Sequence, residues 1–96
     1  MNTTLKALFP LGQTVSTPGA IQALMEEGSG TSDLLSRHVS GDWGDLSEGD
    51  KEENEVSLTE GFRIFSAYIL PRTKVKVWVI TEADRSVTTL LLPDEY

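Results

Sequence analysis

The sequence predicts an α+β fold, in which two or three short N-terminal helices pack on a three- to four-stranded antiparallel β-meander. Three observations predict it. Residues 17–60 place apolar side chains at helical spacing between capping residues, residues 62–92 are rich in β-branched and aromatic residues, and short connections join the predicted strands. Because 96 residues leave room for one core, we expect a single domain over 11–96 after a flexible N-terminal lead, 1–10.

Two helices are expected in the first half of the chain. Thr17 followed by Pro18 is a typical helix start, since a hydroxyl caps the first turn and proline fits its first position. The Gly-Ser-Gly segment 28–30 ends this helix. A second helix is expected to begin at Thr31 and to end at Gly41.

A third helix is expected from Ser47 to Glu60. Ser47 and Asp50 have capping spacing, and Gly61 follows as a stop signal. The helix has few apolar residues, so we expect it to lie on the surface and to depend on its neighbours for stability.

The strands are expected at 62–70, 74–80 and 87–92, with a short edge strand at 13–15. Strict alternation in the second of these segments places its valines on one face and Trp78 on the other. Turns of a few residues between consecutive strands indicate antiparallel pairing.

The net charge of −7 belongs to one segment of the chain. Residues 42–60 hold eight acids and one lysine, the remainder is neutral, and 61–76 holds four bases and no acid. The acidic segment is either a solvated surface that maintains solubility or a surface that attracts a basic protein partner. Direct nucleic-acid binding is disfavoured, because an acidic protein repels the phosphate backbone.

Composition also excludes several classes of protein. The absence of cysteine excludes disulfides, thiolate zinc sites and cysteine nucleophiles, and it fits a reducing cytosol. No apolar run approaches the roughly 20 residues of a membrane span. The N-terminal stretch is too weakly apolar for a signal peptide, so we expect a cytoplasmic protein without membrane association.

The candidate binding residues lie in the acidic segment and in the polar loop 82–86. Trp43, in a glycine-flanked loop, either anchors an interface or packs that loop onto the sheet. The loop 82–86 is either a turn held by an aspartate or by an internal salt bridge, or a recognition loop. The full set of candidates is Asp42, Trp43, Asp45, Glu52, Glu53, Glu55, Glu82, Asp84 and Arg85.

An alternative hypothesis is a metal-independent ribonuclease-like toxin. In such an enzyme a base takes the proton of the 2′-hydroxyl and a cation stabilises the phosphate. The candidate catalytic residues are His38, Arg63 and Tyr68, with hydroxyl groups from Thr81, Ser86 and Thr88. His38 is the only histidine, and its position on an apolar helix face favours packing over metal ligation. No carboxylate pattern has metal-ligand spacing, so neither a metal nor a cofactor is expected.

Several stretches resemble a known family. They are RHVSGDWGD at 37–45, FSAY at 65–68, the segment 77–96 and the helix start at 17–20. Together they resemble small proteins encoded on plasmids and integrative elements, which are often called plasmid-related proteins. The resemblance covers nearly all of the chain after residue 10. It implies a bacterial mobile-element setting and a cytosolic product, and no particular activity or catalytic residue.

The sequence therefore favours a non-enzymatic interaction protein of a mobile genetic element. Its acidic surface would dock on a basic protein, such as one in a host-defence or nucleic-acid-processing complex.

Overall fold

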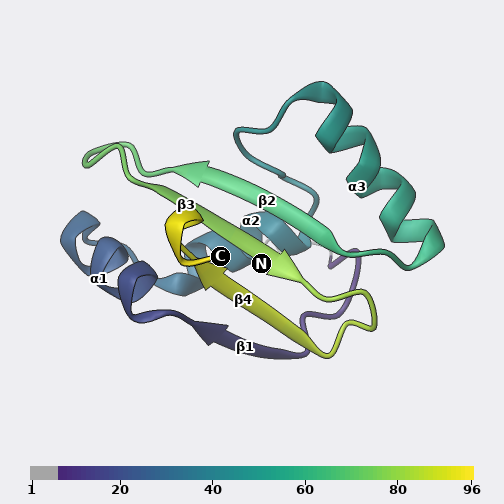
Figure 1. Ribbon diagram of the computed structural model, residues 1–96, viewed down its shortest axis with the longest axis horizontal. Coiled ribbons are helices and arrows are strands. Elements are labelled where there is room, and N and C mark those ends of the chain that lie inside the picture. The colour runs from purple at the N-terminus through teal and green to yellow at the C-terminus, as the bar shows by residue number, and fades with distance from the viewer. Residues whose placement is uncertain (1–6) are drawn as a thin grey trace, which may run out of the picture.

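The protein is represented by a computed structural model, in which residues 7–96 are described. In chain order the elements are β1 (Gln13–Ser16), α1 (Pro18–Glu27), α2 (Thr31–Val39), α3 (Glu48–Glu60), β2 (Ile64–Ile69), β3 (Lys76–Thr81), β4 (Val87–Leu91) and the 3₁₀ turn η1 (Pro93–Glu95) (Figure 1). The predicted α+β class is confirmed. Within the described residues, no helix is long and apolar enough to cross a membrane.

The predicted capping residues define the helix ends. The Thr17 hydroxyl accepts a hydrogen bond from the Ala20 amide at 3.2 Å, and the Ser47 hydroxyl accepts one from the Asp50 amide at 3.1 Å. Gly28 and Gly61 end α1 and α3 in the left-handed conformation that glycine adopts without a steric penalty. The boundaries of α1 and α3 thus follow from local sequence, whereas α2 ends at Val39 with Ser40 as its C-cap, before the predicted stop at Gly41.

The sheet is mixed, and the prediction of a purely antiparallel meander is wrong. The strand order is β1-β4-β3-β2, with antiparallel β2–β3 and β3–β4 pairs and a parallel β1–β4 pair. Short turns impose antiparallel pairing on β2, β3 and β4, whereas β1 joins its partner through most of the chain and no hairpin fixes its direction. The helices are also not strictly N-terminal to the sheet, because β1 precedes them.

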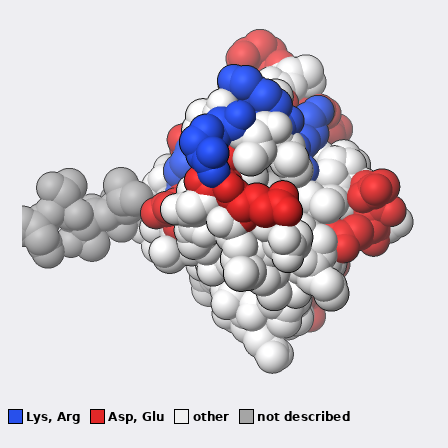
Figure 2. All heavy atoms as spheres, turned by 90° about the vertical axis from the view of Figure 1, so that its left-hand side faces the viewer, with Lys and Arg blue, Asp and Glu red and all other residues white. Residues whose placement is uncertain are grey.

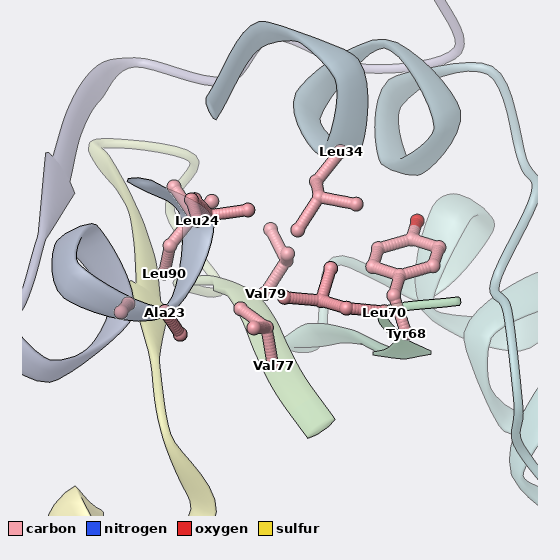
Figure 3. Packing of buried hydrophobic residues seen from close by; sticks show 9 residues of the cluster. Ala23, Leu24, Leu34, Tyr68, Leu70, Val77, Val79 and Leu90 are labelled. Atoms are coloured by element: carbon pink, nitrogen blue, oxygen red, sulfur yellow. The ribbon is translucent and has the colours of Figure 1, made fainter. Parts of the chain in front are cut away.

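The helices α1 and α2 cover one face of the sheet and form the main core with it (Figure 3). The core side chains are almost fully removed from water. They are Ala20, Ala23 and Leu24 of α1, Leu34 of α2, and Tyr68, Leu70, Val77, Val79 and Leu90 from the sheet and its turn.

The third helix, α3, lies beside the outer edge of β2 (Figure 1). The Asn54 side chain pairs with that edge like a further strand: its amide donates to the Phe65 carbonyl at 2.6 Å and its carbonyl accepts from the Phe65 amide at 3.1 Å. The loop before α3 continues the edge, since the Ala67 amide donates to the Trp43 carbonyl and the Asp45 amide to the Ala67 carbonyl. Polar groups that would otherwise recruit another strand are therefore paired.

The N-terminal lead predicted at 1–10 lies partly outside the described residues, which begin at residue 7. Its last residues are held by the domain. The Leu8 amide donates to the Val39 carbonyl at 2.8 Å, and Phe9 is buried beside Trp43 and Ile64 in a second core.

Candidate functional site

Many acidic side chains outside α3 are used in internal hydrogen bonds. Asp42 pairs with Arg37 at 2.6 Å, and this contact lowers the pKa of its carboxyl group. The Asp45 carboxylate accepts from the Ile69 amide at 3.0 Å at the edge of β2. These two predicted binding residues therefore hold the loop in place, and their carboxylates are not free for a partner.

Within the described part of the chain, most carboxylates of α3, unlike those of Asp42 and Asp45, do not bind the backbone or an arginine of the domain. Glu55 accepts a hydrogen bond from the Trp43 indole at 3.0 Å, and Glu48 pairs with Lys51 at 3.5 Å. Four further acids on this helix are exposed and have no hydrogen-bond or ion-pair partner for their carboxylates among residues 7–96; they are Asp50, Glu52, Glu53 and Glu60. We call these four residues the acidic surface of α3.

A groove of about 670 Å³ separates α3 from the sheet face that α1 and α2 leave uncovered. Its floor is formed by Phe65 of β2 and by Trp78 and Ile80 of β3. These residues alternate along their strands with the core side chains, so they point to the opposite face. In Figure 1, α2 lies behind the sheet and α3 lies beside β2. The volume is typical of a ligand-binding site.

Aromatic side chains dominate this groove. The Phe65 and Trp78 rings meet edge to face at 5.1 Å, and Trp78 meets Tyr96 in the same way at 5.9 Å. Tyr96 is 70% exposed, and Phe62 at the rim is 58% exposed. Exposed apolar surface that adjoins a hollow is typical of an interaction site.

The groove has one acidic wall. Asp50 and Glu53 of α3 line it, one helical turn apart, and Val56 continues the same wall. Arg63 also lines the groove; its guanidinium donates to the Tyr96 hydroxyl at 3.0 Å and lies 5.7 Å from the centre of that ring. Glu52, although equally exposed, does not line the groove.

Trp43 packs the loop onto the domain, which was one of the two interpretations of its sequence context. It is 4% exposed and packs with Phe9 and Ile64. The flanking glycine has a geometric role: Gly44 has φ of 78°, and a Cβ atom there would collide with the Ala67 carbonyl oxygen. The ring is therefore not accessible as an interface anchor.

His38 lies in a buried chain of hydrogen bonds. Its Nδ1 is 2.6 Å from the Ser66 hydroxyl and its Nε2 is 2.9 Å from the Thr81 hydroxyl. Thr81 is 2.7 Å from Thr88, which donates to the Leu11 carbonyl at 2.7 Å. Because a carbonyl can only accept, Thr88 must accept from Thr81, and Thr81 must accept from Nε2–H. In the neutral ring, Nδ1 must then accept from Ser66.

The protonation state of His38 follows from its burial. The imidazole is fully buried, and this desolvation lowers its pKa to about 4 from an ordinary value of 6.5. The ring is therefore neutral at pH 7. Together with the fixed tautomer, this burial gives His38 a structural role and keeps it out of contact with any substrate.

The other residues of the ribonuclease hypothesis have separate partners. The Tyr68 hydroxyl donates to the Asp42 carbonyl at 2.6 Å, and burial raises the pKa of this phenol to about 12. Arg63 bonds Tyr96 on the opposite face of the sheet. Within residues 7–96, no hydrogen bond joins any two of His38, Arg63 and Tyr68. Thr81 and Thr88 belong to the buried chain, and the Ser86 hydroxyl bonds Asp84.

The loop 82–86 is a structural turn. The Asp84 carboxylate accepts from the Ser86 hydroxyl at 2.6 Å and from its amide at 3.0 Å, and these bonds lower the pKa of Asp84. The Arg85 guanidinium points inward, donating to the Phe62 carbonyl at 2.7 Å and to the Ser57 carbonyl at 2.9 Å near the C-terminus of α3. Of the predicted binding residues here, Glu82 alone keeps its side chain free among the described residues.

The basic segment after α3 is also partly internal. The Arg72 side chain bonds the carbonyls of Glu26 and Glu27 at the end of α1, and the Glu27 carboxylate accepts from the Arg72 and Thr73 amides. Lys74 and Lys76 remain exposed. Figure 2, which views the end of the molecule that carries α1 and the β2–β3 turn, shows Lys and Arg gathered beside a strip of carboxylates, with an uncharged region below them.

The described residues offer no cation site. Within 7–96, no group of three or more histidine and acidic side chains is arranged to hold a metal ion. Comparison with protein-family models, with curated proteins and with solved structures gives no match.

The sequence-based candidates missed the groove. Phe65 and Trp78 were expected in strands, and Trp78 was placed correctly on the face opposite the valines. A signal was present, because Phe65, Trp78 and Ile80 put apolar side chains on a face that would be polar if it simply met water. Two of the candidates, Glu53 and Arg63, line the groove, but the sequence did not place them in one.

Proposed function

We propose that this chain is a non-enzymatic interaction protein that docks on a basic protein through the acidic surface of α3. The observation that carries the proposal is the difference between the acidic residues: Asp42, Asp45 and Asp84 bind internal donors, whereas Glu52 and Glu53 bind none among residues 7–96. Unpaired charges on one helix give a partner a local target and speed its association.

A protein partner fits this surface better than a nucleic acid does. The chain carries a net charge of −7, and phosphate groups would be repelled by the acidic wall of the groove. A setting on a bacterial mobile element is part of the proposal and rests on the sequence resemblance alone. A cytoplasmic location is also part of the proposal, and it rests on that resemblance, on the absence of cysteine and on the weakly apolar N-terminal stretch.

The proposal is tested by affinity capture from host cells with two charge-reversed proteins. Glu52→Lys/Glu53→Lys reverses two charges on the acidic surface of α3, and Asp33→Lys/Asp94→Lys makes the same change in net charge at exposed positions elsewhere. Glu55 is left unchanged, because its bond to Trp43 would confound the result.

We expect the wild type and the Asp33→Lys/Asp94→Lys protein to recover the same basic protein, and the α3 variant to lose it while keeping its circular dichroism spectrum. Equal recovery by all three proteins would exclude α3 as the docking surface.

A further inference from the structure

The aromatic groove beside α3 provides an apolar binding surface in addition to a charged one. Its floor of Phe65, Trp78 and Ile80 is apolar, and the exposed rings of Phe62 and Tyr96 extend that surface toward solvent. Water in contact with this surface is released when an apolar side chain enters the groove, which favours binding.

The charge of the groove selects its occupant. Asp50 and Glu53 face the groove without a partner among the described residues, while Arg63 is engaged with Tyr96. A cationic group above the aromatic floor would meet both unpaired carboxylates and the faces of aromatic rings. The contact of Arg63 with the Tyr96 ring shows that this rim already accommodates a guanidinium group.

The backbone of β2 does not take part in recognition. Asn54 pairs with both polar groups of Phe65, and the loop around Asp45 pairs with Ala67 and Ile69. A partner therefore cannot add a strand at this edge, and side chains must carry its specificity.

We propose that the groove binds a segment of a partner protein in which an aromatic or aliphatic side chain is flanked by lysine or arginine. The apolar side chain enters between α3 and Trp78, and the flanking cation pairs with Asp50 and Glu53. This inference rests on the proposed function, because it names the partner chemistry and places the contact in the groove.

The test uses a display library of random dodecapeptides selected on the immobilised protein. Peptides that are recovered are then titrated against purified variants by fluorescence anisotropy. Glu53→Lys and Phe62→Ala alter the groove at exposed positions, and Asp33→Lys is the matched control, because Asp33 is an exposed carboxylate of α2 that lies outside both the groove and the acidic surface of α3.

We expect the selected peptides to be enriched in lysine and arginine around one apolar residue. Their affinity should fall about tenfold or more in Glu53→Lys and in Phe62→Ala, and by less than about twofold in Asp33→Lys.

Four results would overturn the inference: no such enrichment, equal losses in Asp33→Lys and Glu53→Lys, displacement of the peptides by an oligouridylate, or occupation of the groove by a second copy of the chain. A different set of results would exclude the proposed function. If partner capture depends on Glu52 and Glu53 but not on Phe62, the acidic surface of α3 is still the docking surface and the groove is excluded as the binding site. If capture depends on neither carboxylate, the proposed function itself is excluded.

Discussion

At the scale of single residues, the buried polar side chains act as a directed chain that ends on a backbone carbonyl. Ser66, His38, Thr81 and Thr88 are each fully buried, and each has a defined donor or acceptor. Burial of polar groups is tolerated only when their hydrogen bonds are made, so the chain connects α2, β2, β3 and β4 through mutually dependent contacts.

This arrangement predicts a pH dependence of folding that belongs to His38. The folded protein binds a proton on His38 only near pH 4, whereas the unfolded chain binds it near pH 6.5. Stability is therefore fully present above pH 6.5 and falls as the pH drops toward 4. Between pH 7 and pH 5 we expect a loss of about 2 kcal/mol in the free energy of unfolding, measured by urea denaturation.

His38→Gln is the control for that measurement. The carboxylates of Asp42, Asp84 and Glu95 also have lowered pKa values, but their contributions are lost only as the pH falls below their ordinary values, near 4. The variant should show a flat profile between pH 7 and pH 5. If the free energy of unfolding of the wild type were equally independent of pH, and its imidazole titrated near pH 6.5 by NMR, the lowered pKa of His38 would be contradicted.

The end of the buried chain predicts different effects at two adjacent threonines. Thr88→Val removes the donor to the Leu11 carbonyl and the acceptor of Thr81, so we expect a cost of about 1–3 kcal/mol in the free energy of unfolding. Thr89→Val makes the same chemical change on the opposite face of β4 and should stay within about 0.5 kcal/mol of wild type. Equal effects of the two changes would show that the chain of hydrogen bonds does not stabilise the fold.

At the scale of elements, local sequence signals predicted the helices, whereas contacts between distant residues determine how the strands pair. Thr17 with Pro18, Ser47 and Gly61 defined helix ends because capping depends on neighbouring residues. The parallel pairing of β1 depends on a strand more than 70 residues later, for which the sequence contains no local signal. The strand β3 starts at Lys76 because Lys74, with φ of 66°, still belongs to the turn.

The junction between α3 and β2 predicts a specific weakness. Asn54→Leu would leave the Phe65 amide and carbonyl unpaired, so we expect a loss of about 2 kcal/mol or more in the free energy of unfolding. Hydrogen exchange at the Phe65 amide should also be faster. Thr59→Leu, at an exposed position of the same helix, is the control, and unchanged Phe65 exchange in Asn54→Leu would exclude the pairing.

At the scale of the whole molecule, the sequence showed which segment carries the negative charge but not which of its carboxylates are free on the surface. The acidic segment was evident from composition, whereas the structure divides it into carboxylates that hold Arg37, Ile69 and Trp43 and those that remain free. Trp43 could not be assigned from sequence, because the partners that bury it come from distant segments. The groove required knowledge of which sheet face α1 and α2 leave open.

The central claim, that this groove is the binding surface, is tested most directly by the two tryptophan indoles. A ¹H–¹⁵N spectrum separates Trp78 in the groove from Trp43, whose indole is bonded to Glu55 in the interior. On titration with a selected basic peptide, we predict that the Trp78 indole resonance moves and the Trp43 resonance does not. A Trp78 resonance that stays unchanged at saturation with the peptide would contradict the account.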